Sequence, residues 1–564
     1  MSRVFVALAV CAALLAPAAA GGAGIVDTVH NLSATGAGAV KAPGVGEVCI
    51  FCHTPHRAGQ TVALWNRDLP ARTYNLYGSS TLEATLNQPT GASRLCLSCH
   101  DGTTALGNLR VAPATGPATL GPLTGRASLG TDLSDDHPAS FLFDTALALK
   151  QGQLVDPTGL PKAVPLDSTR QLQCTSCHDP HENRYRKFLR VDDRFAALCT
   201  ACHRQRNWVG SAHATSVATW NGSGTNPWPS SPYTTVADNG CESCHRPHAA
   251  PRPPRLLSDP QEPAVCLVCH SGSVAATRLD PEFLKPSAHP ITATSWTHEP
   301  HEDPAAMARH VACTDCHNPH QAITTPGSAP AVPGRLRGVR GLNLAGASVT
   351  EVQQEYEVCL KCHGVRDQTT PGVVRSDNTR NIRLKISPSN PSYHPVATNG
   401  KNDAVGGLEA GWSAGSLLYC TDCHNNDEWT PAGTRPRGSH GSRYTPILER
   451  EYQVNDPSSE SYQAYAMCYK CHNRSVLIED RARTFLHKKH VVDTQASCAV
   501  CHDAHGSRQS IRLINFMLRD RTGKTVVSPS QGQKRLEYIS TGPGRGTCYL
   551  LCHGKNHEPK TYPD

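Results

Sequence analysis

The sequence has few of the large apolar side chains that normally fill a protein core. Of its 564 residues, 38% are hydrophobic, 5% are aromatic and only 4 are Met, whereas Gly contributes 45 and Pro 43. A chain of this length normally divides into domains with apolar cores, and this composition supplies too little for them. The charged fraction of 18% is too modest for an intrinsically disordered chain. We therefore expect a compact protein whose interior is filled by something other than Leu and Phe.

Long runs of a single kind of residue are also missing. Lys and Arg are interspersed with Asp and Glu, so the net charge of +7 indicates a mixed surface rather than a nucleic-acid interface. After the first twenty residues, no segment has the ~18 consecutive apolar residues that a membrane span needs. The sequence thus predicts no nucleic-acid partner and no transmembrane segment in the mature chain.

The N-terminus has the pattern of an export signal. Ser2 and Arg3 precede an apolar run from Val4 to Leu15, and the small residues Ala18–Ala20 follow it. This run is too short to cross a bilayer. We predict a signal peptide over residues 1–20, which contains Cys11, and an exported protein that is periplasmic, extracellular or at the cell surface.

Cysteine and histidine are the abundant residues, with 25 and 29 copies. Outside the predicted signal, all 24 cysteines belong to twelve motifs. Eleven of these motifs read Cys-x-x-Cys-His, whereas the last has one extra residue between its cysteines. The motifs are Cys49/Cys52/His53, Cys96/Cys99/His100, Cys174/Cys177/His178, Cys199/Cys202/His203, Cys241/Cys244/His245, Cys266/Cys269/His270, Cys313/Cys316/His317, Cys359/Cys362/His363, Cys420/Cys423/His424, Cys468/Cys471/His472, Cys498/Cys501/His502 and Cys548/Cys552/His553.

This spacing is typical of covalent haem attachment. Two thiols add to the two vinyl groups of one haem, and the histidine that follows ligates the iron. Zinc would need sets of four ligands, with no reason for a histidine after every second cysteine. A catalytic dithiol would need only one such site. We predict twelve c-type haems, which form the core of a chain that is mostly coil with short α-helices and little β-structure.

The motifs fall into six consecutive pairs, which predicts an internal repeat of di-haem units. In five pairs the first motif is followed, three positions after its histidine, by a further histidine. This trailing histidine is too near to reach the other face of its own haem, so we expect it to bind a neighbouring one. The predicted segments are 1–20 (signal peptide), 21–130 (pair 1), 131–210 (pair 2), 211–285 (pair 3), 286–380 (pair 4), 381–480 (pair 5) and 481–564 (pair 6).

The remaining histidines supply candidates for the second axial ligand of each iron. Five are the trailing histidines, one is His440, which replaces the trailing histidine missing after the ninth motif, and six lie upstream of the pairs. The predicted distal ligands are His30, His56, His137, His181, His213, His248, His289, His320, His394, His440, His490 and His505. Two alternatives stay open: His298, His301 or His310 in place of His289, and His487 in place of His490. A Met ligand is less favoured than ordinary packing for Met307, Met467 and Met517.

The first pair carries a resemblance to the doubled Cys-x-x-Cys-His multihaem cytochromes. The similar segments are His30–Ser33, Cys49–His56, Leu64–Arg67 and Leu95–Thr103. The resemblance implies periplasmic or extracellular electron transfer through bis-histidine haems and, in some relatives, polymerisation into filaments. The ninth and twelfth motifs depart from the pattern.

Three functions agree with these features. Electron transfer is favoured, because histidines on both faces of each haem leave no iron open to a substrate. The partners would be other redox proteins or an extracellular electron donor or acceptor. An oxidoreductase would need one five-coordinate haem, for which the twelfth motif is the best candidate. A filament subunit would use His30 to reach a haem of the adjacent copy.

Overall fold

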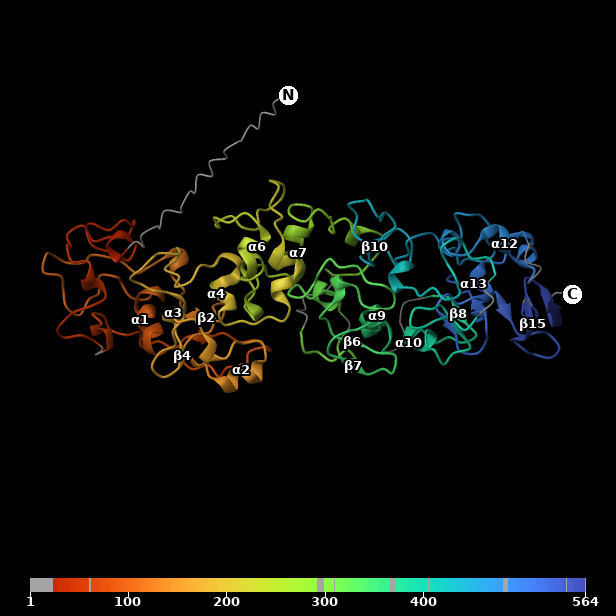
Figure 1. Cartoon of the computed structure of the whole chain (residues 1–564), viewed down its shortest axis with the longest axis horizontal. Helices are drawn as coiled ribbons and strands as arrows, with labels where there is room; N and C mark the ends of the chain where they lie inside the picture. Colours follow the sequence, from red (N-terminus) through yellow and green to blue (C-terminus); the bar gives the residue numbers. More distant parts are fainter. Residues whose placement is uncertain are drawn as a thin grey trace, which may run out of the picture. The chain divides into compact units, whose positions relative to one another are not determined.

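The computed structural model describes residues 24–59, 62–291, 299–308, 310–365, 372–402, 406–479, 485–543 and 545–562. The predicted signal peptide, Cys11 and His298 lie outside these residues. The chain divides into two compact units, whose helices and strands are labelled in Figure 1. The first comprises residues up to Arg204 together with Pro247–Leu256, and it holds motif pairs 1 and 2. The second comprises Gln205–Arg246 and the chain from Leu257 onward, and it holds pairs 3 to 6.

The α-helices are short, and the longest that the structure describes has ten residues. Eight of the thirteen carry cysteines of the motifs. Their bounds are α1 Gly91–His100, α2 Thr145–Gln151, α3 Cys174–Cys177, α4 Ala197–Thr200, α5 Ala212–Thr215, α6 Val236–Asn239, α7 Glu262–His270, α8 Cys313–Cys316, α9 Glu355–His363, α10 Ile382–Lys385, α11 Ala466–Tyr469, α12 Arg474–Ile478 and α13 Cys498–Cys501. Three further motifs begin in the 3-10 turns η2 (Cys49–Phe51), η8 (Gly240–Ser243) and η12 (Cys420–Asp422).

Most strands have two residues and pair in small two-stranded ladders. Their bounds are β1 Asn75–Leu76, β2 Asp132–Leu133, β3 Phe141–Leu142, β4 Gln171–Leu172, β5 Ser287–Ala288, β6 Gly341–Leu342, β7 Ser348–Val349, β8 Val374–Arg375, β9 Ser392–Tyr393, β10 Gly441–Ser442, β11 Gly506–Ser507 and β12 Met517–Arg519. The ladder β1–β2 is parallel, and the others of this size are antiparallel. The expectation of coil with short helices is therefore confirmed over the described residues.

A four-stranded antiparallel sheet near the C-terminus is the exception. It consists of β13 Val527–Ser528, β14 Glu537–Gly542, β15 Arg545–Cys552 and β16 Lys555–Tyr562. Strand β15 is central, since β16 pairs along one side while β14 and then β13 pair along the other. This sheet was not predicted from the sequence.

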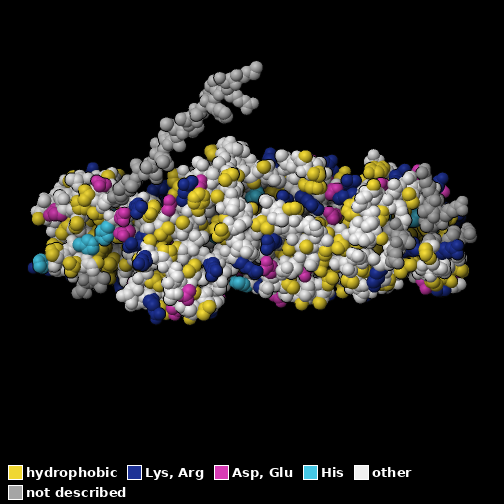
Figure 2. All heavy atoms as spheres, viewed as in Figure 1, with side chains coloured by type: hydrophobic (Ala, Val, Ile, Leu, Met, Phe, Trp, Pro, Cys, Tyr) yellow, Lys and Arg dark blue, Asp and Glu magenta, His cyan; other side chains and the backbone are white. Residues whose placement is uncertain are grey.

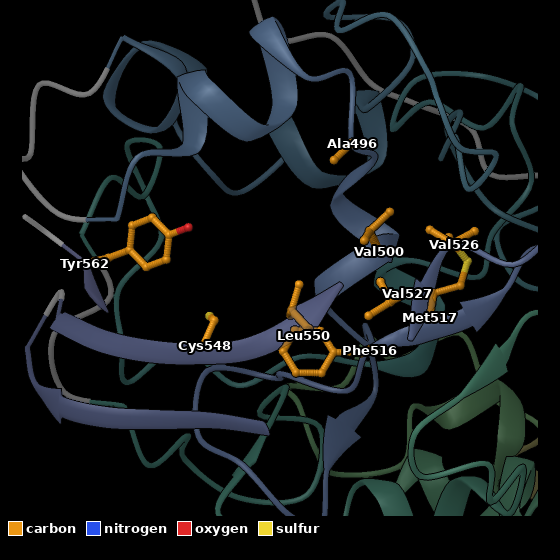
Figure 3. Packing of buried hydrophobic residues seen from close by; sticks show 9 residues of the cluster. All are labelled: Ala496, Val500, Phe516, Met517, Val526, Val527, Cys548, Leu550 and Tyr562. Atoms are coloured by element: carbon orange, nitrogen blue, oxygen red, sulfur yellow. The ribbon is translucent and has the colours of Figure 1, made fainter. Parts of the chain in front are cut away.

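Apolar packing is concentrated beside the same sheet. Nine buried side chains form one cluster there, and they come from α13, β12, β13, β15, β16 and the loops between them (Figure 3). Each of the other five described clusters contains only three or four buried side chains. Most of the chain thus builds very little apolar core from its own residues.

The described residues include no helix that is both long enough and apolar enough to span a bilayer. On the face drawn in Figure 2, basic and acidic side chains are interspersed, and neither sign gathers into one continuous patch. This distribution agrees with the mixed surface expected from the sequence.

Arg67 ties the two motifs of the first pair together from inside. Its side chain is almost fully buried, with 1% of the residue exposed. The guanidinium donates hydrogen bonds to the carbonyl oxygens of Leu106 (2.6 Å), Ala105 (2.8 Å) and Ser98 (3.3 Å). Ser98 lies between the cysteines of the second motif, so this one side chain fixes that helix against the segment that follows it.

We expect Arg67→Leu to lower the free energy of unfolding by about 2–4 kcal/mol, because three buried carbonyl groups lose a charged donor. Arg72→Leu, at an exposed position, is the matched control and should change stability by less than about 0.5 kcal/mol. Denaturant unfolding of the purified protein, followed by circular dichroism, measures both. Equal midpoints for the two variants would contradict the role given to Arg67.

Candidate haem-binding sites

The eleven Cys-x-x-Cys-His motifs share one backbone conformation. In each, the two cysteines lie on a single helical turn, in η2, α1, α3, α4, η8, α7, α8, α9, η12, α11 and α13 or directly after them. The histidine N–H then bonds to the carbonyl of the first cysteine, as from His53 to Cys49 (2.8 Å) and from His502 to Cys498 (3.0 Å). Residues three apart on such a turn have Cβ atoms about 5–6 Å apart. The two thiols therefore lie on one side of the turn, with the histidine at its end.

A second imidazole faces the motif histidine in every first motif of a pair. The ring centres lie 6.0 to 6.5 Å apart, and the ring planes differ by 1° to 37°. The pairs are His53–His181, His178–His248, His245–His320, His317–His440, His424–His505 and His487–His502. In the first five, the trailing histidine, or His440 in its place, comes from the next pair along the chain.

The second motifs of pairs 1 to 5 have the same separation but a different orientation. Here the partner is the histidine upstream of the same pair. Ring centres are again 6.0 to 6.5 Å apart, whereas the planes are inclined by 53° to 84°. The pairs are His30–His100, His137–His203, His213–His270, His289–His363 and His394–His472.

These separations fit two axial ligands of one iron. With metal–nitrogen bonds of about 2 Å and about 1.2 Å from nitrogen to ring centre, imidazoles on opposite sides of one metal have centres about 6.4 Å apart. The rings in the structure are therefore correctly spaced to hold a metal between them.

Backbone carbonyls orient the motif histidines. The Nδ1 atom lies 2.8 Å from the Ala127 oxygen in His100, 2.8 Å from the Lys187 oxygen in His178 and 2.9 Å from the Arg512 oxygen in His502. A proton on Nδ1 satisfies each carbonyl and leaves the lone pair on Nε2, which is the usual arrangement of metal-bound histidine.

The upstream and trailing histidines are joined to each other. The upstream Nδ1 reaches the carbonyl just before the trailing histidine, as from His213 to Pro319 (3.0 Å) and from His289 to Ser439 (2.7 Å). Where His440 follows, the two-residue ladder β5–β10 continues the contact, and the His289 N–H donates to the His440 carbonyl (3.2 Å). One hydrogen-bonded junction thus presents two imidazoles, each to a different motif.

Burial holds several of these imidazoles in the neutral form. It lowers the pKa of His424 to about 4, and the facing His505 lowers it further. Burial also lowers the pKa of His440 to about 3, with His317 as the next cause. Neutral imidazole is the form that binds a metal, so these sites need not lose a proton near neutral pH before ligation.

Neighbouring motifs bring their sulfur atoms together. Within a pair, the second cysteines lie close together: after burial, Cys99 is the next cause that raises the pKa of Cys52, and Cys202 the next cause that raises the pKa of Cys177. From one pair to the next, the first cysteines hydrogen-bond to each other in four cases: Cys96–Cys174, Cys266–Cys313, Cys359–Cys420 and Cys468–Cys498. None of the 24 described cysteines forms a disulfide.

His310, an alternative to His289 in the sequence analysis, lies in a separate charged cluster. Its Nε2 is 3.2 Å from Glu302 and 3.6 Å from Asp315. Ligand atoms of these three residues all lie within 4.8 Å of one another, as a cation site would require. The ammonium of Lys361 is already 2.7 Å from the Asp315 carboxylate, so we assign the cluster as an ion-pair network.

The structure separates the predicted distal ligands into those with a facing motif histidine and those without. Ten of the twelve have one. His56 does not face a described imidazole, because it is the first trailing histidine and no pair precedes it. His490 stacks against Phe485 (4.8 Å between ring centres), and His487, the stated alternative, faces His502 instead.

The twelfth motif has neither the turn nor the facing imidazole. Cys548 and Cys552 lie on strand β15, and His553 follows in the turn to β16. His553 Nε2 contacts the Asp456 carboxylate at 2.9 Å. A strand in place of the helical turn was not predicted from the sequence.

Comparison with known proteins agrees with these sites. The family model "Doubled CXXCH motif" matches residues 168–207 and 234–275, which contain both motifs of pairs 2 and 3. A "Multiheme cytochrome MtrA" of Shewanella baltica (strain OS185) is 27% identical over 164 residues, covering 27% of this chain and 37% of that protein. The chain is a multihaem c-type cytochrome. The match thus covers well under half of this chain and well under half of the relative.

The filament hypothesis required His30 to reach a haem of an adjacent copy. In this cytochrome it faces His100 of the same chain, at 6.1 Å, and its Nδ1 lies 3.2 Å from the Pro180 carbonyl. Its position needs no adjacent copy, and a homopolymer is not supported.

The facing imidazoles lead to a test on the haem-loaded cytochrome. His181→Ala removes the ring opposite His53, so we expect one iron per chain to change from low-spin to high-spin. His56→Ala is the matched control, because His56 has the same position after its motif and faces no described imidazole. Quantitative electron paramagnetic resonance of the ferric proteins measures the change. A high-spin signal of equal size in both variants would contradict the assignment.

Proposed function

We propose that this cytochrome is an exported electron-transfer protein that binds c-type haems along the chain and holds most of their irons between two histidines. The observation that carries the proposal is the set of eleven facing imidazole pairs, all with centres 6.0 to 6.5 Å apart. When bound, each haem would supply a site that accepts and releases one electron.

The chain's own residues support a bis-histidine site at each pair. Two thiols on one turn attach the macrocycle, Nδ1–carbonyl contacts set the ring orientation, and the facing ring closes the second axial position. Because both positions are taken, a substrate would find no open iron at these eleven sites. Electron transfer is therefore favoured over an oxidoreductase activity.

The contacts between cysteines support an electron path that follows the sequence within each unit. Second cysteines meet inside a pair, and first cysteines meet between pairs, so each motif has its sequence neighbours on either side. In pairs 4 and 5, Lys361 and Lys470 of the second motifs bond to Asp315 and Asp422 of the first motifs. These contacts hold successive attachment sites together without an apolar core.

Other redox proteins, or an extracellular donor or acceptor, are the partners we propose. The apolar run and small residues of the N-terminal pattern support export to the periplasm or beyond the cell. No feature of the described surface favours nucleic acid.

The ring orientations predict two spectroscopic classes of haem. At the first motifs, the facing imidazole lies within 37° of parallel to the motif histidine. At the second motifs of pairs 1 to 5, the two ring planes are inclined by 53° or more. Because axial ring orientation changes the orbital splitting of low-spin ferric iron, we expect a rhombic class and a strongly anisotropic class in nearly equal amounts. Low-temperature electron paramagnetic resonance of the oxidised protein measures their ratio, and a single class would contradict the alternation.

Ligand access distinguishes electron transfer from catalysis. We expect the fully reduced protein to bind no carbon monoxide at its bis-histidine irons, yet to reduce a ferric chelate rapidly in stopped-flow experiments. His181→Ala should bind one carbon monoxide per chain, which gives the assay its positive control. Stoichiometric binding by the unaltered protein would instead support the oxidoreductase.

A further inference from the structure

The twelfth motif differs from the other eleven in the backbone that carries its cysteines. Cys548 and Cys552 both lie on the central strand β15. Four residues of extended strand span about 13 Å, compared with about 5–6 Å between the cysteines of a helical turn. The two thiols are therefore too widely spaced for the two vinyl groups of one haem.

Strand pairing on both sides fixes this spacing. Cys548 is paired with Tyr538 on β14 and with Lys560 on β16, while Cys552 is paired with Val527 on β13 and with Lys555 on β16. Forming a helical turn here would break hydrogen bonds to three strands, at about 1 kcal/mol each.

His553 is held in a tight hairpin turn. It and Gly554 form the two-residue connection between β15 and β16, and their φ angles are +49° and +72°. Positive φ at both positions is the mark of a type I′ turn. Whereas Nδ1 of His100 and His178 faces a backbone carbonyl, the Nε2 atom of His553 contacts Asp456, whose side chain is 3% exposed. No described imidazole faces the His553 ring.

The twelfth motif lies in an apolar cluster that is larger than the clusters elsewhere in the described structure. Cys548 and Leu550 point from β15 toward Val500 and Tyr562, within the cluster of nine buried side chains (Figure 3). Val500 lies between the cysteines of the eleventh motif, so this cluster covers that motif with protein. The C-terminal sheet is thus a cap with its own core.

From these features we infer that the twelfth motif carries no covalent haem, and that the chain binds eleven haems while Cys548 and Cys552 remain thiols. The inference rests on the proposed haem attachment at the other motifs. It assigns the C-terminal sheet the task of covering the eleventh site.

Peptide mass spectrometry of the haem-loaded protein tests the inference directly. Trypsin releases Gly546–Lys555, which contains both cysteines, and His490–Arg508, which contains the eleventh motif. After denaturation and treatment with iodoacetamide, we expect two alkyl groups and no haem on the first peptide. The second peptide should carry one haem and no alkyl group, and the intact mass should correspond to eleven haems.

Each outcome separates the inference from the proposed function. Haem on both peptides would overturn the inference alone, whereas haem on neither would overturn the proposed function. As a second measurement, Cys548→Ala/Cys552→Ala should keep the number of haems, while Cys498→Ala/Cys501→Ala should lose one. The measurements on the unaltered protein decide the question even where a variant fails to fold.

Discussion

Two imidazoles held about 6 Å apart are the constraint on which this cytochrome depends. Neither ring belongs to a large apolar core, and the members of a pair are up to 128 residues apart in the sequence, as for His53 and His181. Several rings are positioned by contacts to backbone carbonyls, as His289 is by the Ser439 oxygen. The surrounding structure can therefore be mostly coil, provided that the helical turn of each motif and the junction of each pair are kept.

Two local structures position the ligands: the helical turn of each motif, and the hydrogen-bonded junction between an upstream and a trailing histidine. A turn of three or four residues sets the two thiols and the first histidine, whose ring is then oriented by a carbonyl of a later segment, as His100 is by Ala127. A junction sets the second histidine, and it joins segments from different pairs. Because the two-residue ladders β5–β10 and β9–β11 pass directly beside the histidines, small strands position ligands here rather than building sheets.

The attachment residues can be predicted from the sequence alone, because the motif is local: both cysteines and the first histidine lie within five residues. Of the twelve distal candidates predicted from the sequence, ten face a motif histidine in the structure. The sequence cannot assign them to irons, because His181 and His53 are brought together by loops that carry no periodic signal. That the trailing histidine serves the preceding pair, and the upstream histidine its own, is visible only in the structure.

The strand at the last motif was not predicted for a related reason. Its extra residue gives the cysteines an even spacing, which on a strand places both side chains on one face. The residues between them, Tyr549, Leu550 and Leu551, include an aromatic and two large apolar side chains, and strands favour aromatic residues. These residues favour a strand in the sequence itself, but counting the two cysteines as a motif like the other eleven favoured a helical turn instead.

The backward reach of the trailing histidine has a consequence for how the molecule is made. The facing pair at His53 stays incomplete until residue 181 has been synthesised, and the pair at His424 waits for His505. Each of motif pairs 2 to 6 thus supplies the imidazole that faces the first motif of the pair before it. The first motif of pair 6 is faced instead by His487, from the segment just before that pair. An N-terminal fragment that ended after any of pairs 1 to 5 would therefore lack one facing imidazole at its newest end.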